Sequence, residues 1–358
     1  MTNEVNKIIS VGFVKPPILG HKKRGIGIFG QNLMQALSKS KNIRIEEITV
    51  DDNKNQFDII HYPYFDPFFL TLPFKSPVPT VVTIHDLIPL RLKKYYPAGI
   101  KGKIKWEIQK RVIRTASHIC TDSFSSKEDI KKYLAICDER ISVVYGGVDE
   151  VYYLPISQKI MDETAKKYNI IEKFILYVGD INYNKNIPGL LTAFSQIIQK
   201  ENIDLILVGP AFTQKTVELD EIKQKIKDLS LGEKVKLVNY VSNMELRSLY
   251  KLASLYVQSS FAEGFGLSVL EAMASGCPVV SSRETSLKEI CADVVVPINP
   301  YDETNISEGI IKALKDETLR NKNIQKGIAQ AKKFTWEDAA LKTEEIYLRV
   351  LAQYEKQE

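Results

Sequence analysis

The sequence lacks the marks of secreted, membrane-spanning and disordered proteins. Only four of its 358 residues are cysteine (Cys120, Cys137, Cys277 and Cys291), and none has CxxC spacing, which favours reduced thiols packed in a core. No run of about 18 apolar residues is present, so we expect no membrane-spanning helix. The first residues include the acidic Glu4 and are typical of a first strand, not of a secretory signal. We therefore expect a cytoplasmic protein.

The bulk composition is that of a globular protein with a substantial core. Charged residues make up 26% of the chain and hydrophobic residues 44%. A length of 358 residues favours two domains, at roughly 100–200 residues for each. Basic residues outnumber acidic ones in residues 1–158, whereas the remainder is close to neutral. This imbalance indicates that the first half meets something anionic.

Short apolar runs rich in β-branched residues alternate with helical patterns along most of the chain. Such alternation predicts parallel sheets that are covered by helices on both faces. In the first half we expect strands over 8–14, 43–50, 57–61, 80–84, 118–121 and 141–144, with helices that include 29–38 and 125–134. In the second half we expect strands over 174–178, 205–208, 235–238, 255–257, 278–281 and 294–296, with helices that include 190–200 and 267–275.

The pattern restarts in the middle of the chain without a linker rich in Pro, Gly or Ser. The predicted fold class is α/β, with two Rossmann-like, doubly wound parallel-sheet domains facing a cleft. We place the domains at 1–160 and 161–335, followed by a helix at 336–358 that could cross back to the first domain. In such folds ligands bind outside the carboxyl ends of the strands.

The segment from Glu263 to Glu271 has the strongest chemical character. A strand leads into Glu-Gly-Phe-Gly and then into the helical pattern that begins at Leu267. The glycines allow a close approach of the backbone to a ligand, and the first N–H groups of a helix suit a phosphate. The two carboxylates can border one pocket and accept hydrogen bonds from sugar and ribose hydroxyls. The alternative is a purely structural role, in which the glycines form a tight turn and an acidic residue near the start of the helix interacts favourably with the helix dipole.

The stretch EGFGLSVLEAMASGCPVVSS, residues 263–282, resembles the signature of the retaining glycosyltransferases of family 4, which have the GT-B fold. Each further match is weak alone, but their number and order support the resemblance over nearly the whole chain. They lie at 25–27 (GIG), 58–61 (DIIH), 83–86 (TIHD), 123–130, 146–149 (GGVD), 177–179 (YVG), 184–186 (NKN), 286–289 (SLKE) and 334–337 (FTWE).

The resemblance implies that the first domain, 1–160, is the acceptor side and that the second domain, 161–335, binds the nucleotide sugar. Glu263 would contact hydroxyls of the donor sugar, and Glu271 would bind the ribose. Backbone N–H groups at Gly266 and Leu267 would hold the pyrophosphate. The remaining residues that the resemblance assigns to the nucleotide sugar are Gly264 and Phe265 of the same loop, and Tyr240 and Val241 near the nucleobase.

The resemblance also implies that Lys185 neutralises the phosphates and so supports departure of the nucleoside diphosphate. His85 would sit beside the transferred sugar, which makes His85, Lys185 and Glu263 the candidate catalytic residues. The loop with Gly25 and Gly27 would face the diphosphate from the first domain. The donor is a substrate, and no separate cofactor is expected.

One position departs from the family pattern. Many relatives place an Arg directly after the glycine of the Tyr-Val-Gly strand, whereas Asp180 stands here. One positive charge for the diphosphate is therefore missing. Arg283, Lys23 or Arg24 could compensate, turnover could be slower, or the chain could be a non-catalytic partner subunit that binds nucleotide sugars.

The histidines allow other interpretations. His85 and His61 each end an expected strand and could be structural. A metal site built from His61, His85 and Asp86 has no supporting histidine pair or carboxylate cluster. The sequence contains no Asp-x-Asp pair, which metal-dependent glycosyltransferases typically use, so we expect no metal. The glycine pattern at 25–30 invites a dinucleotide site, but it follows its strand by too many residues.

Residues 91–114 are strongly basic and interleaved with apolar residues. A stretch of this kind can lie on an anionic membrane surface, or it can be a solvated helix whose apolar face packs on its own domain. Nucleic acid is not an expected partner, because no recognised binding module is present. The basic residues are Arg91, Lys93, Lys94, Lys101, Lys103, Lys105, Lys110, Arg111 and Arg114.

Together these features predict a retaining, metal-independent hexosyltransferase that uses GDP-mannose or a UDP-hexose. The acceptor would be a glycan or a lipid-linked sugar in surface polysaccharide synthesis, handled at the inner face of the membrane. Another GT-B enzyme, such as a sugar-nucleotide epimerase or a phosphorylase, is the alternative among enzymes.

Overall fold

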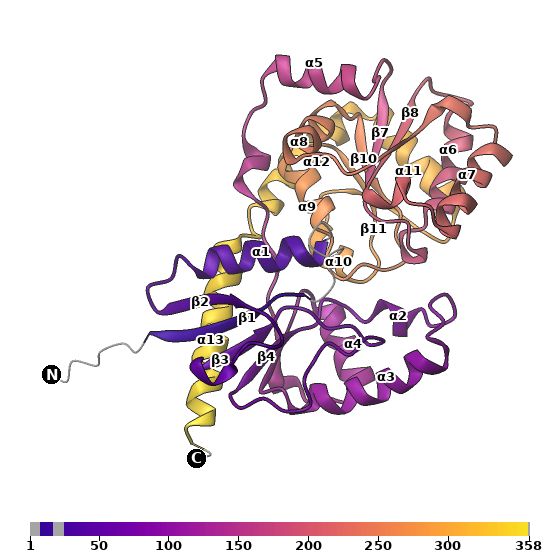
Figure 1. Ribbon diagram of the computed structural model, residues 1–358. Coiled ribbons are helices and arrows are strands. Elements are labelled where there is room, and N and C mark those ends of the chain that lie inside the picture. Colours follow the sequence, from indigo (N-terminus) through magenta and orange to yellow (C-terminus); the bar gives the residue numbers. More distant parts are fainter. Residues whose placement is uncertain (1–7, 17–24, 357–358) are drawn as a thin grey trace. The chain divides into compact units, whose positions relative to one another are not determined.

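The computed structural model describes residues 8–16 and 25–356. The chain divides into two compact units (Figure 1). The first unit comprises Met1–Gly147 together with Phe334–Glu358, and the second comprises Val148–Lys333. The first unit is therefore built from two separate stretches of chain, and the second unit is continuous.

The first unit contains a parallel sheet of six strands in the order β2-β1-β3-β4-β5-β6. The inner strands are apolar runs that are buried on both faces, as expected for a parallel sheet covered by helices. The strands are β1 (Ile9–Val14), β2 (Ile43–Ile48), β3 (Ile59–Tyr62), β4 (Thr80–Thr83), β5 (His118–Thr121) and β6 (Ile141–Val143).

The helices of the first unit include one from the far end of the sequence. The helix expected over 336–358 is α13 (Trp336–Tyr354), yellow in Figure 1, which packs against α1. Buried aliphatic and aromatic side chains from the strands and α4 form a core cluster. The helices are α1 (Gly25–Leu37), α2 (Ile88–Arg91), α3 (Gly99–Val112), α4 (Phe124–Leu134) and α13.

The second unit repeats this architecture with the strand order β12-β11-β10-β7-β8-β9, again all parallel. The strands are β7 (Phe174–Val178), β8 (Asp204–Val208), β9 (Val235–Val238), β10 (Leu255–Gln258), β11 (Val279–Ser282) and β12 (Val296–Ile298). The helices are α5 (Gln158–Lys167), α6 (Ile187–Ile197), α7 (Val217–Asp228), α8 (Asn243–Leu252), α9 (Leu267–Ala274), α10 (Ser286–Cys291), α11 (Glu303–Lys315) and α12 (Glu317–Ala331).

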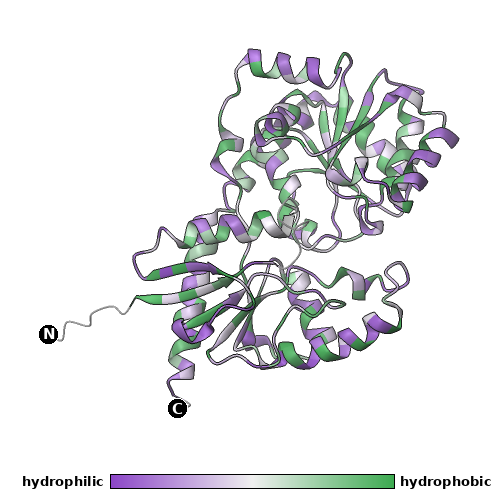
Figure 2. Cartoon of the chain, in the orientation of Figure 1, coloured by the Kyte–Doolittle hydropathy of each residue, from purple (hydrophilic) through white to green (hydrophobic). Residues whose placement is uncertain are grey.

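Hydropathy follows this layering within each unit. Figure 2 shows strands that are mostly hydrophobic and helices that carry hydrophilic residues along one side. Side chains from β7, β8 and α6 contribute to a hydrophobic core cluster of the second unit. Several helices begin at a side chain that accepts a hydrogen bond from the first turn, and α8 begins with a reciprocal capping box between Ser242 and Glu245.

The predicted fold class, with two doubly wound parallel-sheet α/β units, is confirmed. Two local predictions are wrong. The last strand lies at Val296–Ile298 and not at 294–296, and Cys137 is exposed whereas the other three cysteines are buried. Within the part of the chain that the structure describes, no helix is both long and apolar enough to cross a membrane.

Gly147 marks the point where the first unit meets its returning C-terminal segment. A Cβ atom at this position would lie 2.2 Å from the backbone nitrogen of Trp336 and 2.4 Å from the carbonyl carbon of Thr335. Both neighbours are backbone atoms at the start of α13, so they can yield only if the helix moves. The absence of a side chain at residue 147 therefore allows α13 to dock.

We expect Gly147→Ala to displace the start of α13 and to destabilise the chain by about 1–3 kcal/mol. A lower urea midpoint would show this. Gly30→Ala is the matched control, because its Cβ would meet nothing closer than 3.8 Å and it lies inside α1. There the change should be neutral or stabilising by about 0.5–1 kcal/mol. Equal midpoints for wild type and Gly147→Ala would contradict the packing argument.

Candidate functional site

The second sheet has a topological switch point between β7 and β10. The chain runs from β7 through β8 to β9, and then returns to place β10 on the other side of β7. In doubly wound sheets the ligand binds at such a point, outside the carboxyl ends of the strands. Lys185 follows β7 and Glu263 follows β10, so the fold places both predicted catalytic residues of this unit at the switch point.

Lys185 and Glu263 form a close ion pair. The Lys185 ammonium lies 2.8 Å from Oε1 and 2.6 Å from Oε2 of Glu263. The Glu263 side chain is only 8% exposed and that of Lys185 19%. A buried charge needs a partner of this kind. Because an ammonium has three N–H donors and its contacts with the described residues direct two of them at Glu263, one remains for a ligand phosphate.

Further donors fix the Glu263 carboxylate. Its Oε1 atom also accepts hydrogen bonds from Gln258 at 2.7 Å and from the Ser260 hydroxyl at 2.6 Å. The backbone just before Glu263 is held as well, because Asn184 donates to the carbonyl oxygen of Ala262 at 2.8 Å. The carboxylate is therefore held in one orientation before any ligand arrives.

The backbone of Glu263 is held by the start of the next loop. The Thr285 hydroxyl accepts from the Glu263 N–H at 2.8 Å and donates to its carbonyl oxygen, while Ser286 donates to the same carbonyl. Thr285 has a φ of +51° and a ψ of −128°, which is costly for a β-branched residue. The strain persists because these hydrogen bonds fix the residue, and such strain tends to occur at functional sites.

The loop from Gly264 to Leu267 forms the start of α9. Gly266 has a φ of +115° and caps the helix without a side-chain hydrogen bond. A Cβ atom there would lie 3.0 Å from Leu287, so both the backbone angle and the space favour glycine. Phe265 is buried. Val269 and Leu270 already donate their N–H groups to the Gly266 carbonyl, so the N–H groups of Leu267 and Ser268, at the very start of α9, are those that can hold an anion.

Glu271 lies one turn into α9 and has a different environment. Tyr250 donates a hydrogen bond to its Oε2 at 3.1 Å, and Tyr152 also hydrogen-bonds to the carboxyl group. Removal from water raises the pKa of Glu271 to about 7, against the lowering effect of the two tyrosines, and Asp149 adds to the rise. This carboxyl group therefore changes charge near neutral pH.

The predicted nucleobase segment lies at the far side of the same edge. Tyr240 and Val241 follow β9, which is the outermost strand beyond β8. Tyr240 is half exposed and its N–H bonds to the side chain of Asn239, whereas Val241 is buried. These two residues thus stand two strands away from Lys185.

The position where relatives place the cation holds Asp180, which follows β7. Asp180 accepts a hydrogen bond from the N–H of Ile181, and its carbonyl accepts from the Tyr177 hydroxyl. Arg283, a predicted substitute, follows β11 and pairs with Asp293 at 3.3 Å. The other two substitutes, Lys23 and Arg24, lie outside the described residues.

In the first unit, His85 is buried at the carboxyl end of β4. Its Nδ1 lies 2.6 Å from Oδ2 of Asp122, and its Nε2 lies 3.0 Å from the carbonyl oxygen of Pro63. A carbonyl oxygen can only accept, so Nε2 carries a proton. Burial by itself lowers the pKa of His85, but the Asp122 carboxylate and the Pro63 carbonyl outweigh it and raise that pKa above the ordinary value of 6.5. In this arrangement the Nε2 atom of His85 donates a hydrogen bond and does not serve as a proton acceptor.

Gly25 and Gly27 were expected in a loop, and this part of the prediction is wrong. Both residues lie in the first turn of α1, which begins at Gly25. The carboxyl end of β1, which precedes α1, adjoins the switch point of the first sheet, between β1 and β3. A helix start suits a phosphate as well as a glycine loop does, so the predicted role of the two glycines stays open.

His61 has a structural environment. It lies in β3, where Nδ1 contacts the Tyr347 hydroxyl at 2.5 Å and Nε2 contacts Thr83 at 2.8 Å. Burial lowers the pKa of His61 to about 3, and the charge of His85 acts in the same direction. Among the residues described, no group of three or more His, Cys, Asp and Glu side chains could hold a metal ion.

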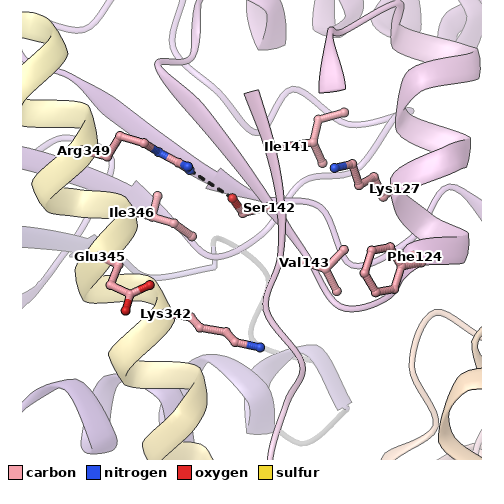
Figure 3. A pocket seen from close by; sticks show the side chains of 9 residues that line it. All are labelled: Phe124, Lys127, Ile141, Ser142, Val143, Lys342, Glu345, Ile346 and Arg349. Atoms are coloured by element: carbon pink, nitrogen blue, oxygen red, sulfur yellow. Dashed lines mark hydrogen bonds between the residues drawn. The ribbon is translucent and has the colours of Figure 1, made fainter. Parts of the chain in front are cut away.

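One cavity in the first unit contains none of the predicted site residues. It measures about 370 Å³ and lies along β6, the edge strand, between α4 and α13 (Figure 3). Arg349 of α13 hydrogen-bonds to Ser142 and to His118, so its guanidinium is turned into the sheet edge. The cavity is lined by Phe124, Lys127, Ile141, Ser142, Val143, Lys342, Glu345, Ile346 and Arg349.

Several residues of the site could not be assigned from the sequence. Asp122 directly follows the expected strand 118–121, and His85 directly follows the expected strand 80–84. These two strands are neighbours in the sheet, so the position of Asp122 was a usable signal that it lies near His85. Gln258, Ser260 and Thr285 gave no such signal in the sequence, because polar side chains at the ends of strands and in the loops after them are common. Tyr250 and Tyr152 come from distant segments, and only the folded chain brings them to Glu271.

Replacement of the partner of His85 offers a test of the buried pair. In wild type the pKa of His85 should exceed 6.5, and Asp122→Asn should lower it because burial would then act without the carboxylate. The His85–Asp122 pair contributes its full stabilisation at pH values below the pKa that His85 has in the unfolded chain. This contribution is lost as the pH rises through the pKa that His85 has in the folded chain. NMR titration of the imidazoles measures both effects, with uncharged His61 as an internal control. A wild-type pKa at or below 6.5 would contradict the assignment.

Two family descriptions match the sequence. Glycosyltransferase Family 4 matches residues 13–152, and Glycosyl transferases group 1 matches residues 161–330. The second match contains the whole site around Lys185, Glu263 and Glu271. The first contains His85 and Asp122.

Characterised relatives with similar sequences include bacterial mannosyltransferases. The chain is 28% identical to O-antigen chain mannosyltransferase B of Escherichia coli, over 81% of this chain and 75% of that protein. It is also 28% identical to the serotype-specific mannosyltransferase WbdA of Escherichia coli, over 80% of this chain but only 35% of that protein. It is 29% identical to O-antigen chain mannosyltransferase RfbU of Salmonella typhimurium, over 68% of this chain and 63% of that protein.

Solved structures resemble the chain along almost its full length. Sucrose-phosphate synthase from Thermosynechococcus elongatus gives a TM-score of 0.77 at 17% identity, with 96% of this chain and 100% of the other covered. Anabaena HepE in complex with UDP-glucose gives a TM-score of 0.75 at 17% identity, with 94% of this chain and 99% of the HepE chain covered. At these identities the likeness shows the fold, which is GT-B. With both halves matched in order, the chain belongs to the group 1 glycosyltransferases of family 4.

Proposed function

We propose that this glycosyltransferase transfers a hexose, with retention, from a nucleotide diphosphate sugar to a glycan or lipid-linked acceptor in surface polysaccharide synthesis. The observation that carries the proposal is the Lys185–Glu263 pair at the switch point, beside the start of α9. This arrangement offers a cation and free N–H groups to a diphosphate and a fixed carboxylate to sugar hydroxyls.

The donor would lie along the carboxyl edge of the second sheet. Its nucleobase would lie by Tyr240 and Val241, with the ribose on Glu271. The diphosphate would meet the N–H groups of Gly266 and Leu267 and the free N–H of Lys185. GDP-mannose is the favoured donor because several relatives are named as mannosyltransferases, and a UDP-hexose is the alternative.

The proposed reaction breaks the bond between the anomeric carbon and the diphosphate oxygen. The acceptor oxygen forms its bond on the same face of the sugar, and an oxygen of the departing phosphate takes the acceptor proton. The chain's part is to stabilise the negative charge that develops on the diphosphate, through Lys185 and the start of α9. We propose that no metal is required, since these groups and not a carboxylate cluster face the diphosphate.

Donor binding tests the site. A thermal-shift panel of GDP, UDP and ADP sugars, each with a chelator, should show one that raises the midpoint. Glu263→Ala and Glu271→Ala should each abolish that shift, whereas Glu317→Ala, an exposed residue on α12, should keep it. Absence of any shift in wild type, or an unchanged shift in both site variants, would overturn the proposal. Donor hydrolysis without acceptor would argue against a non-catalytic subunit.

The pKa of Glu271 predicts a pH dependence of donor binding. Ribose hydroxyls donate to the ionised carboxylate, so affinity should rise as pH rises through about 7. At pH 6 we expect binding about tenfold weaker than on the alkaline plateau. Calorimetry with GDP-mannose suits this test, because its diphosphate diester does not titrate in this range. Glu271→Gln should bind weakly and without the pH dependence, and a parallel slope in that variant would refute the role of Glu271.

We also propose that the basic segment contacts an anionic membrane surface. The structure describes it as the end of α2 and as α3, in which Ile100 is 81% exposed and Ile104, one turn later, 58%. The buried side of α3 holds Gly102, Gln109 and Val112 instead. Ile100 and Ile104 therefore point to solvent among lysines, which favours the membrane interpretation for this side of α3, whereas Trp106 packs against the core of the unit.

A neighbouring loop extends this surface. Gln109 donates hydrogen bonds to the Asp66 carbonyl and to Thr71, and the Lys105 ammonium lies 5.0 Å from the centre of the Phe69 ring. The loop residues Phe69, Leu70 and Phe74 are at least half exposed. Apolar side chains from two segments thus lie beside the basic residues.

Vesicle binding tests this surface. The triple variant Lys101→Glu, Lys103→Glu, Lys105→Glu should bind phosphatidylserine vesicles on the order of a hundredfold more weakly than wild type. The same reversal at the exposed Lys215, Lys223 and Lys227 of the second unit is the control, and it should bind nearly as wild type. Equal binding by wild type and the α3 variant would end the membrane proposal.

A further inference from the structure

The cavity along β6 contains an arginine whose hydrogen-bond partners are neutral. Arg349 of α13 donates through Nη2 to the Ser142 hydroxyl and to Nε2 of His118, each at 3.0 Å. Among the residues that the structure describes, no carboxylate pairs with Arg349, although Glu345 stands one turn earlier on the same helix. A guanidinium has five N–H donors and these contacts occupy Nη2, so the donors on Nε and Nη1 remain for a ligand.

A second cation lines the same cavity. Lys342 lies two turns before Arg349, and Figure 3 shows both side chains extending from α13 towards β6. The Lys342 ammonium lies 5.8 Å from the centre of the Tyr145 ring. Lys127 approaches from α4 and pairs with Asp138 at 2.9 Å. Among the described residues that line the cavity, three are basic and one is acidic, so the lining carries a net positive charge.

The buried side of the cavity responds to this charge. His118 lies in β5, next to β6, and its burial lowers the pKa of the imidazole to about 4. Arg349, Arg140 and Lys127 lower this pKa further. His118 is therefore uncharged at neutral pH and accepts the hydrogen bond from Arg349 without adding a counter-charge. The cations leave a positive potential at this edge of the sheet, which attracts an anion.

The cavity begins close to the candidate catalytic histidine of the first unit. Phe124 lines the cavity, is 57% exposed and is the first residue of α4. This turn is fixed to His85, because Ser126 donates to the His85 carbonyl at 2.9 Å and Asp122 contacts the His85 ring. Since β6 lies two strands from β4, the strand before His85, the two are about 10 Å apart. A ligand beside His85 can therefore extend into the cavity.

We propose that this cavity binds an anionic group of the acceptor, a phosphate or a carboxylate, through the guanidinium of Arg349 and the ammonium of Lys342. The sugar unit that bears this group packs its apolar face on Phe124, and the hydroxyl that receives the hexose lies on the side of His85. The assignment rests on the function proposed above, because it takes the bound molecule as the acceptor. It agrees with the acceptor side expected for the first domain.

Two sources supply the same chemistry. A lipid-linked sugar diphosphate carries phosphate oxygens, and a uronic acid unit of a glycan carries a carboxylate. A guanidinium suits either group, because its planar set of donors matches two oxygens at once. The two sources are therefore distinguished by experiment, with one small probe for each.

Binding of an anion can be measured apart from the transfer reaction. With GDP present to fill the proposed donor site, saturation-transfer NMR should show glucose 1-phosphate or methyl glucuronide binding more tightly than neutral methyl glucoside. Arg349→Gln and Lys342→Gln should each weaken that binding about tenfold. Arg44→Gln, on the opposite edge strand β2, is the matched control and should bind as wild type. Equal binding of charged and neutral probes, or wild-type affinity in both cavity variants, would overturn the site.

The imidazole of His118 reports where the anion binds. An anion on Arg349 changes the hydrogen bond that His118 accepts, so the imidazole resonances of His118 should move when the tighter charged probe is added at pH 7. Those of His61, in β3, should stay in place. Binding that leaves His118 unchanged would place the anion elsewhere and refute the assignment.

Turnover separates the acceptor role from the donor assignment. With the donor that raises the thermal midpoint, the tighter charged probe should speed release of the nucleoside diphosphate beyond hydrolysis alone. Lys342→Gln should need about tenfold more probe for the same effect and should keep donor hydrolysis within about twofold of wild type. No acceleration in wild type would rule out the acceptor role. Failure of wild type to bind any donor would count against the proposed function, whereas the probe titrations and the His118 response do not involve the donor.

Discussion

The ion pair between Lys185 and Glu263 is the interaction around which the second unit is organised at its carboxyl edge. The two charged side chains have little exposure to water and compensate one another, and Gln258 and Ser260 donate further hydrogen bonds to Oε1 of Glu263. The strained Thr285 and the glycine at 266 serve the same end, since both fix the loop that holds Glu263. A site assembled in this way is rigid before the substrate arrives, so binding need not order it.

Much of the fold could be predicted because its signals are local. Parallel strands buried on both faces are continuous apolar runs, so most strand positions in both halves could be placed from the sequence, to within a residue or two. The last strand was predicted two residues too early; it contains Pro297, and a proline is atypical inside a strand, so the local signal is stronger in the valines before it. Gly25 and Gly27 were expected in a loop since glycine disfavours helices, yet the first turn of α1 tolerates them.

The site was predictable where chemistry follows a strand and not where it depends on distant packing. Lys185 and Glu263 lie in loops after neighbouring strands, and the sequence shows both loops. The environment of Glu271 depends on Tyr152 and Tyr250, which approach it from other segments, so neither the hydrogen bonds nor the raised pKa has a local signature. The stacked rings of Tyr183, Phe261 and Tyr301 have no local signature either, because long stretches of sequence separate the three residues and only the fold brings them together.

The discontinuous first unit has a consequence for how the chain acquires its structure during synthesis. Its sheet is translated early, but α13, which packs on α1 and sends Tyr347 to His61, emerges after the whole second unit. The second unit is continuous and can fold as soon as its last strand and helices leave the ribosome. The first unit must wait with part of its apolar surface uncovered until the final helix arrives. During that interval it is the part of the nascent chain most in need of protection by chaperones.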